Sequence, residues 1–113
     1  FMTTAYTSSS SIFLLAFAMI IAAPLSEELL FRGFLLPGFS KSFLTPYGAV
    51  ILSSIVWSVI HMQYDFYGMA TIFLMGLILG AARIKTGSVL VPLAMHSIAN
   101  LIATVETAII LKY

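Results

Sequence analysis

The sequence predicts an all-α, polytopic bundle of transmembrane helices, with about four spanning segments in 113 residues. Hydrophobic residues make up 61% of the chain and charged residues only 8%. An ordinary soluble domain has about 25% charged residues, so five Lys and Arg with four Asp and Glu are too few to cover a soluble fold. The net charge of +1 is also too small for a nucleic-acid-binding surface. The absence of cysteine excludes disulfides and a thiol nucleophile.

Four apolar segments come close to the roughly 20 residues that a membrane-spanning helix needs. They cover about residues 11–36, 48–62, 67–84 and 88–111. Short connections separate them at residues 37–47, 63–66 and 85–87, and a Pro46-Tyr47-Gly48 turn signal introduces the second segment. We treat residues 1–113 as a single membrane-embedded core. Because the first residue is Phe1 rather than Met, we expect a fragment that lacks upstream helices.

The distribution of charge predicts how the bundle is oriented. The first and third connections share one side of the membrane and carry Lys41, Arg83 and Lys85, whereas the opposite side carries Asp65 and Lys112. The positive-inside rule therefore places the first and third connections in the cytoplasm.

The apolar segments contain side chains that are costly in a membrane: Glu27, Glu28, Arg32, His61, His96 and Asn100. A charge near the centre of a spanning helix costs about 2.5–3.5 kcal/mol. Glu28 and Arg32 are spaced i, i+4, so they share a helix face and can form an internal ion pair. Glu27 lies on a neighbouring face without a local partner, which makes it the reactive candidate. The alternative is that all three acidic and basic groups form one structural salt-bridge cluster.

His96 and Asn100 repeat the i, i+4 spacing, whereas His61 stands alone near the end of the second segment. A lone histidine is often only a hydrogen-bonded packing residue, but depth favours a shared site. Counting about 1.5 Å per residue from the cytoplasmic helix ends places Glu27 and His96 roughly 13–15 Å deep, and Asn100 and His61 roughly 20–21 Å deep. All four positions fall in one central layer of a hydrocarbon core about 30 Å thick.

A carboxylate, two imidazoles and a carboxamide in one layer suit hydrolysis without a covalent nucleophile. Glu27 would take a proton from water as general base, with His61 helping to hold that water. His96 and Asn100 would donate hydrogen bonds to the tetrahedral oxyanion. A serine mechanism is disfavoured, because the sequence contains neither a Gly-x-Ser-x-Gly elbow nor an evident Ser–His pair.

Three short motifs carry these polar residues. EELLFR at 27–32 has an EExxxR form, WSVIH at 57–61 is similar to an FxxxH motif, and HSIAN at 96–100 is similar to an HxxxN motif. In this order, over about residues 22–105, they resemble the CPBP family of intramembrane proteases, which includes the CaaX-prenyl endopeptidases and bacteriocin-processing or self-immunity (Abi) proteins. The resemblance implies a multi-pass intramembrane protease, which we expect in the cell membrane of a prokaryote.

The resemblance also implies roles for individual residues. Glu27 and His61 would activate the water, and His96 and Asn100 would form the oxyanion site. Glu28 and Arg32 would support the site. Trp57 replaces the Phe that is usual in the family, a change between large aromatics that we expect to preserve packing. Family members also usually carry further helices upstream.

A metal-dependent mechanism is the alternative within this family, which was long described as metalloproteases. Glu27, His61 and His96 can chemically form a Glu-His-His zinc site. The sequence contains no His-Glu-x-x-His helix, however. We favour a mechanism without zinc or another cofactor, in which Asn100 is explained only by an oxyanion role.

Two other classes of function stay open from the sequence. A proton or cation relay in a transporter would use the acidic pair and the histidines, but it predicts polar residues across the full thickness of the membrane. A non-catalytic immunity or binding protein would keep the pocket without turnover. For a protease, the substrate would be a peptide or lipidated protein in the membrane, and prenylated C-terminal peptides, bacteriocin leaders and quorum peptides are all open.

Overall fold

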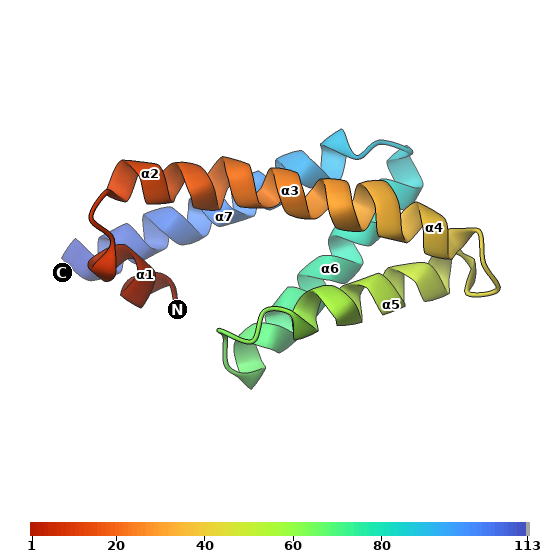
Figure 1. The fold of residues 1–113 in the computed structure, drawn as a ribbon, viewed down its shortest axis with the longest axis horizontal. Coiled ribbons are helices and arrows are strands. Elements are labelled where there is room, and N and C mark those ends of the chain that lie inside the picture. The colour runs from red at the N-terminus through yellow and green to blue at the C-terminus, as the bar shows by residue number, and fades with distance from the viewer. Residues whose placement is uncertain (113) are drawn as a thin grey trace.

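The chain is helical in almost all of the part that the computed structural model describes, residues 1–112, so the last residue of the predicted core lies outside it. Within this range there is no strand. The elements are α1 (Met2–Ser8), α2 (Ile12–Phe17), η1 (Ala18–Ala22), α3 (Ala23–Leu30), η2 (Phe31–Leu35), α4 (Leu36–Ser40), α5 (Thr45–Val59), α6 (Phe66–Thr86) and α7 (Leu90–Lys112). The η segments are π-helical, and the whole forms the predicted helical bundle (Figure 1).

Three helical stretches are long and apolar enough to cross a membrane. They are the continuous helix Ile12–Ser40, α6, and Leu90–Leu111 of α7. The predicted second span, 48–62, has the right length but the wrong position, because α5 lies three residues nearer the N-terminus. With 15 residues it is about 22 Å long at 1.5 Å per residue, which is shorter than the other three helical stretches. It begins before the prediction, at Thr45, and ends at Val59. There the chain leaves the helix through a tighter turn, in which the His61 N–H donates to the Ser58 carbonyl at 3.1 Å.

The helix Ile12–Ser40 runs on past residue 36, where the sequence predicts its end, although it contains Pro24 and Pro37. A proline inside a helix lacks the N–H that would bond one turn back, and its ring crowds the preceding turn. Here each proline follows a five-residue π-helical segment, η1 or η2. The wider π turn absorbs the disruption, and the helix continues.

The helices pack as two antiparallel pairs. Helix α7 lies beside the long α2–α4 helix, while α5 and α6 form a hairpin whose closed end, residues 60–65, splays away from α2 (Figure 1). Helix α1 and the last turns of α7 lie at the same end of the bundle (Figure 1). There the Tyr6 hydroxyl and the Thr104 hydroxyl are 2.9 Å apart, which ties α1 to α7.

Helices α5 and α6 approach closely at a GxxxG motif. A Cβ atom at Gly76 would lie 2.9 Å from the Ser54 Oγ, and one at Gly80 would lie 3.0 Å from a methyl group of Val50. These separations leave no room for a larger residue, so the glycines serve packing within the bundle, as small residues do between membrane helices. Helix α6 then ends at Gly87, whose φ of 69° is the left-handed conformation that favours glycine.

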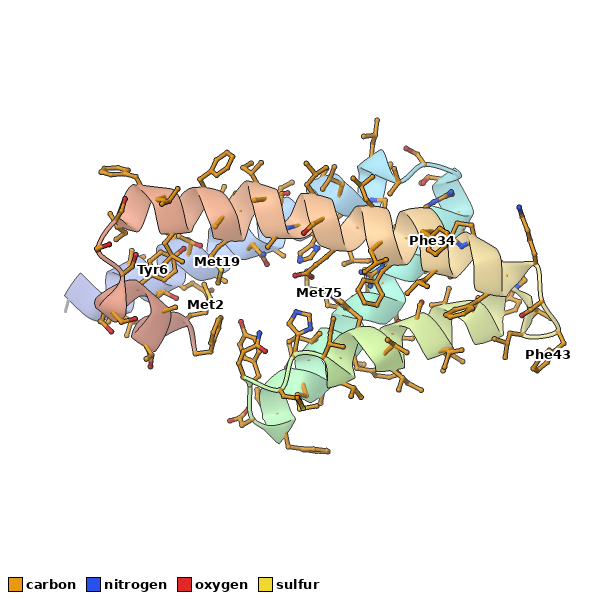
Figure 2. The ribbon with its side chains drawn as sticks, viewed as in Figure 1. Met2, Tyr6, Met19, Phe34, Phe43 and Met75 are labelled. Carbon is orange, nitrogen blue, oxygen red and sulfur yellow. The ribbon has the colours of Figure 1, made fainter. Side chains whose placement is uncertain are left out.

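The distribution of side chains is the reverse of that in a soluble domain. Many large apolar side chains face outward, among them Phe13, 87% exposed, and Phe43, 93% exposed. Met75 points into the centre of the bundle (Figure 2). The buried apolar cluster is small and consists of Phe31, Trp57 and Leu79. The remaining buried positions include several polar groups: Glu28, Arg32, Ser53, Ser54, Ser58, His96 and Thr107. An apolar exterior around a polar interior is what a lipid environment selects.

Candidate active site

The predicted ion pair of Glu28 and Arg32 is present and completely buried. Nη1 of Arg32 donates to Oε1 of Glu28 at 3.0 Å, and the two side chains are 1% and 0% exposed. The same carboxylate oxygen lies 2.8 Å from Nδ1 of His96. The guanidinium also stacks on the Trp57 ring, 4.3 Å from its centroid. Because two helices and an aromatic ring meet at this pair, it joins α3 to α7 and to the core.

Glu27 faces the other way, toward an open pocket, and 25% of its side chain is exposed. Its Oε2 accepts a hydrogen bond from Nε1 of Trp57 at 2.7 Å. Nε2 of His61 is 3.8 Å and Nε2 of His96 is 3.9 Å from the same oxygen. The structure therefore brings one carboxylate and both imidazoles together from three parts of the chain that are far apart in the sequence.

The second nitrogen of each imidazole fixes its tautomer. Nδ1 of His61 is 2.6 Å from the carbonyl oxygen of Trp57, which can only accept, so this nitrogen carries a proton. Nδ1 of His96 likewise donates to the ion-paired carboxylate of Glu28. In the neutral rings both Nε2 atoms are then acceptors aimed at the Glu27 carboxylate. The Glu27 oxygen and the two Nε2 atoms can therefore only accept. A donor must lie between them, either a water molecule or one of the three groups in its protonated form.

Asn100 lies on the same pocket, and a backbone feature explains its position. Its Nδ2 donates to the Met19 carbonyl at 2.7 Å. In an α-helix that carbonyl would accept from Ala23, whose N–H instead bonds to Ala18. In the π register the donor would be residue 24, which is proline and has no N–H. Asn100 thus has a structural role as well, and the interpretation that only an oxyanion role explains it is wrong.

These groups line a pocket of about 270 Å³ near the closed end of the α5–α6 hairpin. Its lining residues are Phe1, Met19, Ala23, Glu27, Trp57, His61, Gln63, Tyr64, Ile72, Met75, His96 and Asn100. Tyr64 lies at its rim, in contact with the Phe1 ring at 5.2 Å between centroids. Burial, and after it the negative charge of Glu27, raises the pKa of the Tyr64 hydroxyl above its usual value. This hydroxyl is therefore a neutral hydrogen-bond donor at the pocket.

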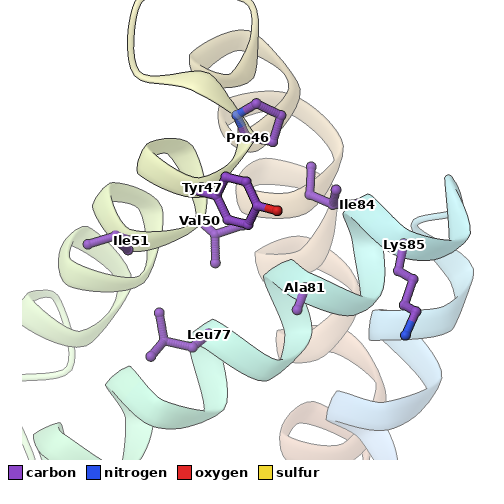
Figure 3. A pocket seen from close by; sticks show the side chains of 8 residues that line it. All are labelled: Pro46, Tyr47, Val50, Ile51, Leu77, Ala81, Ile84 and Lys85. Carbon is purple, nitrogen blue, oxygen red and sulfur yellow. The ribbon is translucent and has the colours of Figure 1, made fainter.

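A larger hollow lies elsewhere, between the first turns of α5 and the last turns of α6 (Figure 3). It has about 600 Å³ and is lined by Pro46, Tyr47, Val50, Ile51, Leu77, Ala81, Ile84 and Lys85. Its lining contains a single cation and no acid or imidazole, so it lacks the groups for acid–base chemistry. The smaller pocket, with its carboxylate and two imidazoles, is the candidate active site.

The donor set of the zinc alternative, Glu27, His61 and His96, converges in this pocket. Its carboxylate–imidazole separations are the 3.8 and 3.9 Å given above. Within residues 1–112, however, neither these three side chains nor any other three of His, Asp and Glu are grouped so that they could hold a metal ion. One carboxylate oxygen of Glu27 is also occupied by the indole N–H of Trp57.

Sequence reasoning missed two contacts that shape the site. Trp57 was expected only to fill space, yet its indole N–H binds the Glu27 carboxylate. The spacing of Glu28 and Arg32 predicted their pair but gave no sign that His96, 68 residues further on, joins it. A partial signal existed for Trp57, because a buried indole N–H usually needs a partner. His61 also lies just beyond α5, in the connection to α6, rather than within a spanning helix.

The comparisons with known proteins agree with the motifs. A family model described as type II CAAX prenyl endopeptidase Rce1-like matches residues 9–102, which confirms the resemblance to the CPBP and CaaX proteases. An uncharacterized 24.3 kDa protein of Escherichia coli is 35% identical over 100 residues, covering 85% of this chain. The chain spans about half of that relative, 46% of its length. No solved structure matches. With three helices able to cross a bilayer, this is an integral membrane protein, and the chain belongs to the Rce1-like family of type II CAAX prenyl endopeptidases.

Proposed function

We propose that this protein is an intramembrane endopeptidase in which a water molecule, activated by Glu27 and His61, hydrolyses a peptide bond. The observation that carries the proposal is the convergence of the Glu27 carboxylate with Nε2 of His61 and of His96, at 3.8 and 3.9 Å, in one pocket. Both separations are too long for a direct hydrogen bond and suit one bridging water. A carboxylate and an imidazole acceptor on one water are the groups that general-base hydrolysis requires.

The first step transfers a proton from this water to Glu27 while the water oxygen attacks the peptide carbonyl carbon. His61 accepts the second hydrogen of the water through its unprotonated Nε2, which fixes the direction of attack. When the tetrahedral intermediate collapses, Glu27 returns the proton to the leaving amine. The carboxylate ends the cycle ionised, so no other acid or base is consumed.

The negative oxygen of the intermediate would be met by His96 and Asn100. Asn100 uses one N–H of its carboxamide on Met19 and has a second one to donate. His96 donates Nδ1–H to Glu28, so a donor at Nε2 requires a doubly protonated ring. The carboxylates on either side, Glu28 and Glu27, offset the charge of that ring. Glu28 and Arg32 thus support the site by holding this imidazole.

The substrate would be a membrane-associated peptide or lipidated protein, and the family assignment favours a prenylated C-terminal peptide. The bacterial relative supports a place in the cell membrane of a prokaryote. A relay of protons or cations is less well supported, because the ionisable groups gather in one pocket. A non-catalytic immunity or binding protein would keep the pocket but leave substrates intact, which the following experiment decides.

The test compares wild-type protein with Glu27→Gln in proteoliposomes, because an amide cannot act as the base. The probe is a farnesylated CaaX peptide with a fluorophore and a quencher on opposite sides of the scissile bond. Membranes of cells carrying each variant are compared by proteomics in parallel to find other substrates. The matched control is Glu106→Gln, since Glu106 is an exposed glutamate at the far end of α7. We expect cleavage by wild type and by the control, and none by Glu27→Gln. Equal cleavage by all three, or identical peptide termini in all three membranes, would overturn the proposal.

A chelator separates the metal-free from the zinc mechanism. We expect activity to survive long treatment with a strong chelator, because in our proposal water is activated by side chains alone. The zinc content of the active protein is measured in parallel by elemental analysis. Stoichiometric zinc, lost together with activity and restored with it, would show that Glu27, His61 and His96 are metal ligands.

A further inference from the structure

Trp57 occupies the centre of the candidate active site. Its side chain is 2% exposed, and its indole N–H donates to Oε2 of Glu27 at 2.7 Å. The imidazoles of His61 and His96 each meet the indole edge to face, with centroids 5.3 Å away. The guanidinium of Arg32 lies 4.3 Å over the ring. One side chain thus contacts the carboxylate, both imidazoles and the buried cation.

The hydrogen bond to Glu27 distinguishes tryptophan from phenylalanine, the residue usual at this position of the motif. Phenylalanine can pack against the imidazoles and the guanidinium, but it has no N–H to donate. The bond is short and its acceptor is a carboxylate, which makes it stronger than a neutral hydrogen bond. It also satisfies the one polar atom of a buried indole, which otherwise would be costly to bury.

Glu27 needs such a restraint, because its side chain is a quarter exposed and packing alone does not hold it. Its two imidazole neighbours stand beyond hydrogen-bond distance. Among the described residues, Trp57 makes the one hydrogen bond within 3.5 Å to this carboxylate. Without it, the carboxylate is free to rotate toward the mouth of the pocket, away from the histidines.

We propose that Trp57 is a positioning residue that holds the Glu27 carboxylate through the indole N–H, so that the carboxylate faces the water between the two imidazoles. This inference rests on the proposed role of Glu27 as base. It differs from the view that Trp57 only fills the core, because it assigns the effect to one N–H rather than to the ring.

The first measurement needs no activity. Trp57 is the single tryptophan of the chain, so the ultraviolet resonance Raman band that reports on indole N–H hydrogen bonding comes from this residue alone. We expect Glu27→Ala to move the band to the position of an unbonded N–H, and Glu106→Ala to leave it unchanged. A band that does not respond to Glu27→Ala would overturn the inference. Since it requires no turnover, this result stands apart from the fate of the proposed protease activity.

The second measurement is the kinetics of Trp57→Phe on the fluorogenic probe. A displaced general base lowers the rate of the chemical step by up to about 10²-fold. We expect kcat to fall in this range while KM and the thermal stability in detergent stay close to wild type. An unchanged kcat would overturn the inference.

If Trp57→Phe reduces the amount of folded protein, the effect of the smaller ring cannot be separated from the effect of the lost N–H. A second variant then separates them. Incorporation of 3-benzothienylalanine keeps the size and shape of the indole and replaces its N–H by sulfur. The same fall in kcat with this residue supports positioning by the N–H. Full activity with it shows that Trp57 acts only by packing.

Discussion

The two π-helical segments, η1 and η2, flank α3 and solve the same backbone problem with different side chains. At η2 the Leu36 N–H bonds to the Phe31 carbonyl, and the following Pro37 has no N–H, so the Arg32 carbonyl loses both helical donors. Nε of Arg83, from α6, donates to that carbonyl at 3.0 Å. The arrangement repeats the one at η1, where Asn100 from α7 donates to Met19 at 2.7 Å.

The difference between the two segments lies in what else the donor can do. Asn100 lines the candidate active site and retains a second N–H, whereas Arg83 lies outside the pocket and only ties α6 to η2. In the proposed mechanism, the donor at η1 satisfies a backbone carbonyl and also binds the oxyanion, whereas the donor at η2 satisfies a carbonyl alone. Arg83 is therefore the natural control for the role of Asn100.

The largest effect is expected between the two segments, at Glu28 in α3. Glu28→Ala leaves the Arg32 guanidinium buried without its partner and removes the contact to His96. Breaking a buried ion pair in this way costs about 3–5 kcal/mol. We expect loss of folded protein in detergent together with loss of activity, and partial recovery of folding when Arg32→Met is added. A Glu28→Ala protein that is inactive but fully stable would show a direct catalytic role in place of a structural one.

Asn100→Ala is expected to have the next largest effect, on the rate. Removing one oxyanion donor lowers kcat by about 10²–10³, with little change in KM, because the donor acts on the transition state. The matched variant, Arg83→Met, removes a tether of the same kind and should leave kcat per folded molecule close to wild type. Equal losses of kcat in both variants would mean that Asn100 acts as a tether alone. Steady-state kinetics on the fluorogenic probe distinguishes these outcomes.

The helical architecture and the grouping of Glu27, His61 and His96 could be predicted from the sequence, whereas the contacts of Trp57 with Glu27 and of His96 with Glu28 could not. Polar side chains in apolar segments are rare enough to single out Glu27, His61 and His96 as site candidates without a structure. The π segments could not be predicted, because one extra residue in a turn barely changes the pattern of a helix that is mostly apolar. Pro24 indicated a disrupted turn, because proline leaves a carbonyl of the preceding turn without its donor. The donor that satisfies the Met19 carbonyl, Asn100, lies 81 residues further along the chain. Contacts at such a distance follow from the packing of helices, which no local spacing encodes.

The third effect is smaller and concerns stability alone. Arg83→Met leaves the part-buried Arg32 carbonyl without a donor, and an unsatisfied buried acceptor costs about 1–3 kcal/mol. We expect lower resistance to denaturation in detergent, of a size similar to the stability loss in Asn100→Ala. A stability equal to that of wild type would show that η2 does not need its tether.

The smallest effect, and the most specific, is a coupling between each proline and its side-chain donor. Pro24→Ala supplies an N–H that can reach the Met19 carbonyl, so in this background Asn100→Ala should destabilise the fold by less, by about 0.5–1.5 kcal/mol. Pro37→Ala should couple to Arg83→Met in the same way. The crossed pairs, Pro24→Ala with Arg83→Met and Pro37→Ala with Asn100→Ala, should be additive, because they are distant and share no partner. Pro24 is fully buried, and the cavity that alanine leaves there cancels within the cycle, since it occurs in both variants that carry it.

The kinetics of the double variant, Pro24→Ala with Asn100→Ala, then complete the comparison. Its new N–H satisfies the Met19 carbonyl at η1, but it cannot donate to an oxyanion in the pocket. Stability should recover while kcat stays low, and recovery of both would show that Asn100 contributes to catalysis only by holding η1 in place.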